Sequence, residues 1–282
     1  MSCVAASCVD AGPAPRPVGG DIRERVRLLH GSAGSAEMWT HTCDEFGSRY
    51  RCSAPDLIGY GTSMPWPPDK PFNLDSELHA IKPLLPCCGE KIHVVGYSYG
   101  GVLGLFLALS NPALVQTLTL IEPVFFAALR YKGNRRAYDQ FRDIRDTFMS
   151  RLSGGDTEAA MSGFIDFWTG EGTWASSPPA IREYMQERAN KIILDWQASF
   201  DAVPDKASLA ALGPRTMLIR GDESPQPMCE LVDSLHQLMP GSSHKIIPGA
   251  NHLLPFTHKR ALHRALMFHL PVAEQPSRNP FA

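Results

Sequence analysis

The stretch KIHVVGYSYGGVLGLFLAL, residues 91–109, carries the strongest structural signal in the chain. Its first residues form a short apolar run of strand character, and the residues from Gly101 onward have the composition of a buried helix. Between them stands Ser98, with glycine two positions before it and two positions after it, at Gly96 and Gly100. This pattern is typical of a turn so tight that neighbouring side chains would collide, with the serine in a strained backbone conformation. It predicts that the Ser98 hydroxyl is presented as a nucleophile at the carboxyl end of a sheet.

Strands and helices alternate on both sides of this turn. The expected strands cover residues 25–29, 50–54, 92–97, 115–121, 216–220 and 244–247. The expected helices cover residues 35–50, 74–85, 101–110, 228–239 and 259–269, the first with Ser35 as its N-cap. Such alternation predicts an α/β fold, in which helices cover both faces of a mostly parallel, twisted sheet.

Residues 124–212 differ from the rest of the chain. They contain no strong strand signal, they are rich in aromatic residues, and they carry amphipathic segments near 135–152, 156–169 and 179–200. We therefore expect a helical insertion that divides the core into two parts. The expected core covers residues 21–123 and 213–272, with a mobile tail at 1–20 and a second tail at 273–282.

Composition excludes several classes of partner. The 282 residues, 44% of them hydrophobic, suffice for one large α/β domain, and the net charge of −2 gives no reason to expect nucleic acid or an anionic membrane surface. No apolar run approaches the roughly 20 residues that span a bilayer, and residues 1–18 lack the features of a signal peptide. Seven cysteines without CxxC spacing argue against a disulfide framework or a metal site. We expect a reduced, cytoplasmic protein, monomer or homodimer, whose partner is a small-molecule substrate.

A nucleophilic serine needs a base and a site for the negative charge that develops during acyl transfer. Among the ten histidines, His252 lies on a loop after the last expected strand, where the base belongs in this chain order. His30 is its rival, although its place beside the glycine-rich turn suits a bracing role. Backbone N–H groups of Tyr99, the residue after the nucleophile, and of Ser32, after the first strong strand, are the expected oxyanion donors.

Four motifs together resemble landmarks of the α/β-hydrolase fold. They are HGSAGS at 30–35, APDLIGYG at 54–61, GYSYGG at 96–101 and GANH at 249–252, and the resemblance extends over residues 26–270. It implies an eight-stranded sheet, a catalytic triad, no cofactor, and a helical cap made by the insertion, which follows the sixth strand of that fold. The chain departs from the pattern at its start, because too few residues precede the first motif for the usual two edge strands.

The triad acid is the second departure. The family pattern implies an acid three residues after Gly221, but that residue is Ser224. Asp222 lies on the correct loop but out of register, and Glu122 follows the strand at 115–121, where some hydrolases of this fold place their acid. Either carboxylate could orient the His252 imidazole. We slightly favour Glu122 as the triad acid, with Asp222 as an almost equal candidate.

A serine nucleophile favours acyl transfer over the chemistry of the aspartate-dependent dehalogenases and epoxide hydrolases of this fold. We expect hydrolysis of a carboxylic ester of a small to medium apolar substrate through an acyl-enzyme. His30, Phe125 and Trp168 are expected to line the pocket. A carbon–carbon bond hydrolase, lactonase, thioesterase or acyltransferase remains an alternative, and a non-catalytic ligand-binding receptor is the alternative from a different class.

Overall fold

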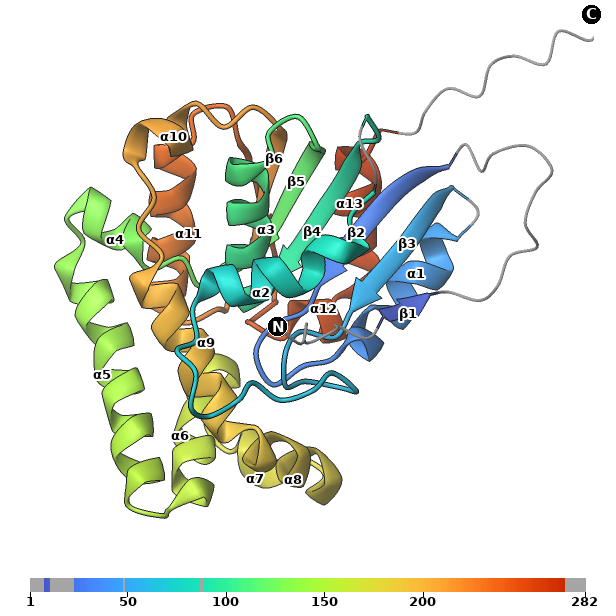
Figure 1. Cartoon of the computed structure of the whole chain (residues 1–282). Helices are drawn as coiled ribbons and strands as arrows, with labels where there is room; N and C mark the ends of the chain where they lie inside the picture. Colours follow the sequence, from blue (N-terminus) through green and yellow to red (C-terminus); the bar gives the residue numbers. More distant parts are fainter. Residues whose placement is uncertain (1–7, 11–22, 48, 87–88, 272–282) are drawn as a thin grey trace, which may run out of the picture.

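A seven-stranded sheet, ordered β1-β3-β2-β4-β5-β6-β7, forms the centre of the molecule (Figure 1). The structure is a computed structural model, and it describes residues 8–10, 23–47, 49–86 and 89–271. The strands are β1 (Cys8–Asp10), β2 (Glu24–Leu29), β3 (Tyr50–Pro55), β4 (Ile92–Tyr97), β5 (Val115–Ile121), β6 (Arg215–Gly221) and β7 (Ser243–Ile247). All neighbouring strands run parallel except β1 and β3, which are antiparallel. The prediction of a mostly parallel sheet is confirmed.

Helices cover both faces of this sheet because successive strand residues point to opposite sides. Val94 packs into one apolar cluster with side chains of α3 (Tyr99–Ser110) and α11 (Gln226–Leu238), whereas its neighbour Val95 packs into the other with side chains of α1 (Thr40–Phe46) and α13 (Lys259–His269). The core helices are α1 (Thr40–Phe46), α2 (Leu74–Ile81), α3 (Tyr99–Ser110), α11 (Gln226–Leu238), α12 (Leu254–Thr257) and α13 (Lys259–His269), with short 3₁₀ turns η1 (Ala36–Trp39) and η2 (Lys82–Leu84). Both faces of the central strands are therefore buried, which explains their continuous apolar sequences.

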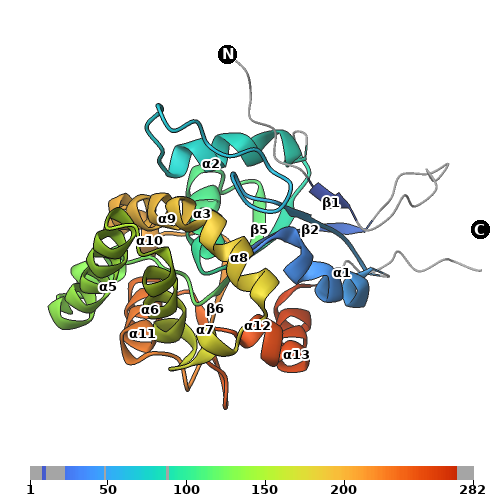
Figure 2. The ribbon, with the colours of Figure 1, turned by 90° about the horizontal axis from the view of Figure 1, so that it is seen from below.

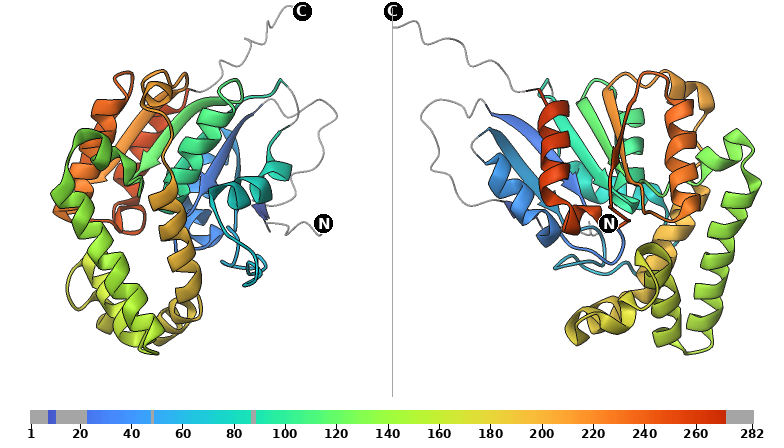
Figure 3. Two further views of the ribbon diagram at one scale, coloured as in Figure 1. Left: turned by 60° about the vertical axis from the view of Figure 1, so that its left-hand side comes forward. Right: turned by 180° about the vertical axis from the view of Figure 1, so that it is seen from behind.

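The chain between β5 and β6 consists of helices joined by short irregular segments, and its residues 124–212 form what we call the insertion. Its helices are α4 (Ala127–Lys132), α5 (Arg135–Ser153), α6 (Thr157–Thr169), α7 (Thr173–Ser176), α8 (Pro179–Glu187), α9 (Ala189–Asp201) and α10 (Lys206–Ala210). Seen from below, α7, α8 and α9 lie in front of the carboxyl ends of the parallel strands (Figure 2), and two further views show the insertion projecting beyond the sheet (Figure 3). Across the described part of the chain, no helix has both the length and the apolar character needed to cross a membrane.

The structure differs from the sequence predictions at the start of the chain. Cys8–Asp10, within the predicted mobile tail, is strand β1, which pairs with β3 and forms the edge of the sheet, whereas the rest of residues 1–20 lies outside the described residues. Three residues are too few to show the alternation by which a strand is recognised. With β1 as the single strand ahead of β2 in the described ranges, the sheet has seven strands instead of eight, and the insertion follows β5, the fifth strand of this chain.

The first core helix also begins differently from the prediction. Ser35 holds the N-cap position, but its side chain makes no capping hydrogen bond. The carboxylate of Asp56, which follows β3, accepts instead from the Ala36 N–H at 2.7 Å. A residue distant in sequence satisfies the helix start, so the local capping rule does not apply here.

The turn between β4 and α3 has the strained geometry that its glycines predict. Ser98 has φ 54° and ψ −117°, a conformation that costs free energy for a residue with a Cβ atom. A Cβ on Gly96 would lie 2.2 Å from the carbonyl oxygen of Gly100, and a Cβ on Gly100 would lie 2.4 Å from the carbonyl oxygen of His30. Because backbone atoms crowd both positions, only glycine fits there.

Gly100→Ala is therefore expected to lower the free energy of unfolding by about 3 kcal/mol, since the added methyl group meets backbone that cannot move aside. Urea denaturation followed by circular dichroism measures this change. Gly241→Ala is the matched control, because its Cβ would meet nothing within 4 Å, and it should change stability by less than about 0.5 kcal/mol. Equal stabilities of the two variants would contradict the crowding argument.

Candidate active site

Three side chains at the carboxyl edge of the sheet form one chain of hydrogen bonds. Ser98 follows β4, Glu122 follows β5, and His252 lies on the loop after β7. His252 Nδ1 lies 2.6 Å from Glu122 Oε2, and His252 Nε2 lies 3.3 Å from Ser98 Oγ. All three residues are buried. Strands β4 and β5 are neighbours in the sheet, which brings the serine and the carboxylate to the same edge.

The hydrogen bonds determine which nitrogen of the imidazole carries the proton. A carboxylate only accepts, so His252 Nδ1–H donates to Glu122. The lone pair of Nε2 then faces the hydroxyl of Ser98 and can accept its proton. This is the arrangement by which a neutral histidine activates a serine.

Glu122 is fixed by two further donors. Its Oε1 accepts from the Gly221 N–H at 2.8 Å and from the hydroxyl of Ser224. The carboxylate is fully buried, and a buried charge of this kind needs its acceptor capacity filled. Ser224, which holds the position where the family pattern implies an acid, thus donates to the acid that lies elsewhere.

Asp222 does not contact His252. Its side chain is exposed and accepts from the Gly249 N–H at 2.6 Å, so it supports the start of the loop that carries the histidine. Of the two predicted acids, the slightly favoured Glu122 contacts the imidazole and Asp222 does not. The side chain of Asp222 is already bonded to the turn after β7, away from the imidazole.

Two aromatic rings enclose the His252 imidazole. Trp168, from α6 of the insertion, stacks on it with ring centroids 4.4 Å apart and planes inclined by 27°. The Tyr97 ring contacts the imidazole in a tilted arrangement, with ring centroids 5.1 Å apart, and its hydroxyl donates to the His252 carbonyl oxygen at 2.8 Å. These contacts orient the ring and cover its two faces. Trp168 therefore lies at the site as expected, while the contribution of Tyr97 was not foreseen.

Two backbone segments meet Ser98 where an oxyanion would form. Tyr99 is the first residue of α3, and the first N–H groups of a helix have no acceptor within it. The loop that follows β2, residues 30–35, which we call the oxyanion loop, passes so close that a Cβ on Gly31 would lie 2.9 Å from the Ser98 Cβ. Ser32, next along this loop, lines the cavity beside Ser98. The predicted donors Ser32 and Tyr99 thus flank the serine.

His30 and Phe125 do not line the cavity, contrary to prediction. His30 is fully buried: its Nε2 accepts from the Leu57 N–H at 2.9 Å, and its Nδ1 lies 2.8 Å from the carbonyl oxygen of Gly31. Burial lowers the pKa of His30 to about 4, so the ring is neutral and braces two loops. Phe125 is also fully buried and packs against Phe106 in the core.

A cavity of about 810 Å³ opens above Ser98 and His252. Its inner wall is apolar and aromatic, and most of it comes from the insertion. The side chains of this wall include Phe164, Ile165, Trp168, Met185, Trp196 and Leu253. Charged residues from the core line its outer part, namely Glu37, Asp44 and Lys259. Among the residues that the structure describes, no group of three or more His, Cys, Asp or Glu side chains could hold a metal ion.

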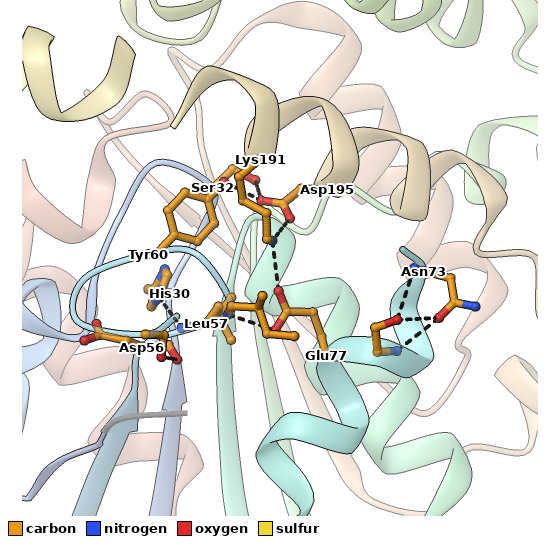
Figure 4. A network of polar contacts seen from close by, with 12 residues as sticks. His30, Ser32, Asp56, Leu57, Tyr60, Asn73, Glu77, Lys191 and Asp195 are labelled. Carbon is orange, nitrogen blue, oxygen red and sulfur yellow. Dashed lines mark hydrogen bonds and ion pairs between the residues drawn. The ribbon is translucent and has the colours of Figure 1, made fainter. Parts of the chain in front are cut away.

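A buried polar network behind the oxyanion loop escaped prediction (Figure 4). It joins Asp195 and Lys191 of α9 to Glu77 of α2, Tyr60 and Ser32. Burial raises the pKa of Asp195 and of Glu77, and Lys191 opposes both shifts. In the sequence, the i,i+4 spacing of the lysine and the aspartate suggests an exposed helix pair, so no local signal identifies this network.

Comparisons with known proteins agree with this architecture. A sequence profile of the alpha/beta hydrolase fold matches residues 25–259. The chain is 33% identical over 119 residues to probable lysophospholipase BODYGUARD 1 of Arabidopsis thaliana, covering 40% of this chain and 25% of that protein. It is 28% identical over 158 residues to lipase LipV of Mycobacterium tuberculosis, covering 56% of this chain and 54% of that protein. The crystal structure of MGS-M2, an alpha/beta hydrolase enzyme from a Medee basin deep-sea metagenome library, superposes with a TM-score of 0.76 at 16% identity, covering 94% and 93% of the two chains.

The depressed pKa of His30 predicts a loss of stability in acid. The unfolded state binds a proton near the ordinary pKa of 6.5 and the folded state only near 4, so this contribution is complete above pH 6.5 and is lost as the pH falls toward 4. Between pH 7.5 and 5 the wild type should lose about 2 kcal/mol more than His30→Gln, which cannot take up a proton. Urea titrations at both pH values measure this. His79→Gln, which removes an exposed imidazole, should behave like the wild type, and parallel losses in all three proteins would refute the prediction.

Proposed function

Because the chain belongs to the α/β-hydrolase family, we propose that it is a serine hydrolase that cleaves carboxylic esters of small to medium apolar substrates. The observation that carries the proposal is the hydrogen-bonded series Glu122–His252–Ser98 at the floor of an aromatic cavity. A nucleophile, its base and the group that orients the base are the parts that acyl transfer requires.

The reaction proceeds in two halves. In the first, His252 Nε2 takes the Ser98 proton as Oγ attacks the ester carbonyl, and the N–H groups of Ser32 and Tyr99 stabilise the oxyanion. The imidazolium, stabilised by Glu122, gives its proton to the departing alkoxide, and an acyl-enzyme remains. In the second half, His252 takes a proton from water, the resulting hydroxide attacks the acyl carbonyl, and the proton returns to Ser98 as the carboxylic acid leaves.

The cavity supports the choice of substrate. Its volume of about 810 Å³ suits a ligand of drug-like size, and its apolar wall would bind an apolar acyl or alcohol group. The insertion acts as a cap in this proposal, since Trp168 stacks directly on the base and closure over the site would exclude water. The names of the relatives, a probable lysophospholipase and a lipase, also fit ester hydrolysis.

Ser98→Ala should reduce p-nitrophenyl ester hydrolysis by at least about 10⁴-fold and abolish labelling by a fluorophosphonate, because the attacking oxygen is gone. Steady-state kinetics and mass spectrometry of the labelled protein measure both effects. Ser234→Ala is the control. It removes a buried hydroxyl on α11 that belongs neither to the Glu122–His252–Ser98 series nor to the cavity wall, so it should retain activity and labelling. A wild type that neither labels nor turns over esters, thioesters, lactones and vinylogous diketones would favour a ligand-binding receptor.

Glu122→Gln should lower kcat by about 10²–10⁴-fold, since an amide cannot hold the same tautomer or stabilise the imidazolium. Asp222→Asn is the matched carboxylate-to-amide control, because its amide oxygen can still accept from the Gly249 N–H. We expect its kcat to stay within about threefold of the wild type, as for a surface change outside the reacting groups. The opposite order of effects would return the role of acid to Asp222.

A further inference from the structure

We propose that Asp195, on α9 of the insertion, is a positioning residue that holds the oxyanion loop in its working conformation, so that correct seating of the insertion completes the oxyanion hole. This inference rests on the proposed function. It assigns to the insertion a role in transition-state stabilisation in addition to covering the site.

The direct link is a pair of hydrogen bonds on one carboxylate oxygen. Asp195 Oδ2 accepts from the hydroxyl of Ser32 at 2.7 Å and from the hydroxyl of Tyr60 at 2.6 Å (Figure 4). Ser32 is the residue whose backbone N–H we place in the oxyanion hole. Because its side chain is bonded to a fully buried group, the direction of that N–H depends on α9.

The carboxylate is itself held from the other side. Lys191, one turn earlier on α9, pairs with Asp195 Oδ1 and reaches Glu77 Oε1 at 2.9 Å. Glu77, on α2 of the core, accepts with its other oxygen from the Ile58 N–H at 3.2 Å. The lysine nitrogen also lies 4.8 Å from the ring centroid of Tyr60. The network therefore joins the insertion to two parts of the core through groups that are nearly or wholly buried.

The energetics of burial favour a positional role over a purely stabilising one. Removing these charges from water costs several kcal/mol per ion, and well-packed apolar residues often give equal or greater stability. What a buried, paired carboxylate supplies and an apolar side chain cannot is a hydrogen-bond acceptor at a defined point. Here that point is beside the hydroxyl of Ser32.

Backbone strain in the oxyanion loop shows why the loop needs support. Ala33 has φ 59°, in the left-handed region that non-glycine residues rarely adopt, and such a conformation persists only where the surroundings impose it. The insertion bonds to both neighbours of Ala33. Asp195 bonds Ser32, and the hydroxyl of Tyr184 on α8 donates to the Gly34 carbonyl oxygen at 3.1 Å.

The triad has no comparable dependence on Asp195. Ser98, His252 and Glu122 all lie on core segments, and their mutual hydrogen bonds do not pass through α9. Loosening the Ser32 contact should therefore weaken the oxyanion hole while the nucleophile and base stay aligned. This separation gives the inference its test.

Ser32→Ala keeps the backbone N–H but removes the hydroxyl that Asp195 holds. With a p-nitrophenyl ester, kcat should fall by about 10- to 100-fold, less than for deletion of an oxyanion donor, while KM changes by less than about threefold. Ser32→Thr, which restores a hydroxyl, should recover most of the loss. The control is Ser199→Ala on α9, the helix that carries Asp195. The Ser199 hydroxyl donates to the backbone oxygen of Asp195 at 2.8 Å and not to its carboxylate, so this variant should retain wild-type kcat.

Hydrogen–deuterium exchange of the amides in residues 30–35 gives a second readout that needs no turnover. Ser32→Ala, and Asp195→Asn where it folds, should exchange faster in this segment than the wild type and Ser199→Ala. Wild-type kcat, unchanged exchange, or a rise in KM alone in Ser32→Ala would each overturn the inference. A wild type inactive toward esters would refute the proposed function instead, and exchange would still decide whether Asp195 holds the loop.

Discussion

The tight turn that presents Ser98 is the constraint on which the rest of the site depends. Its backbone at φ 54° and ψ −117° is accessible only because Gly96 and Gly100 leave room for the carbonyl groups packed against them. The same crowding brings the oxyanion loop against the serine, since a side chain on Gly31 would collide with Ser98. Ser98 and the oxyanion loop are thus placed together by one set of steric contacts.

The position of the acid follows from the sheet order. The segment after β5 lies beside the segment after β4, so a carboxylate at residue 122 can reach a histidine that arrives from β7. The acid follows β5 in this chain, and the loop after β6 carries Ser224 instead. The Ser224 hydroxyl donates to Glu122. The donors that satisfy the buried carboxylate also fix its orientation. The loop after β6 therefore supports His252 indirectly, through Glu122.

The sequence was most informative where a local rule and the tertiary structure agree. The apolar strands, the glycine-flanked serine and the closing helix at Lys259–His269 are set by periodicity and backbone sterics, which act over a few residues. Prediction failed where a distant partner decides. Asp56, not Ser35, caps the first helix, and His30 turns inward because Leu57 offers it a buried donor. In both cases the partner comes from a loop that is distant in the sequence.

The Lys191–Asp195 pair is a clearer example of a contact that the local sequence does not predict. Its i,i+4 spacing would suit an exposed helix face, and only the packing of α9 against α2 and Tyr60 turns it into a buried group with core partners. Its burial carries a desolvation cost, whereas the surface pair Arg142–Asp139 on α5 carries little. A helix of the insertion that bears such a pair is most stable where both charges keep their partners. The network thereby restricts how the insertion can rest on the core, and it transmits that restriction to the loop beside Ser98.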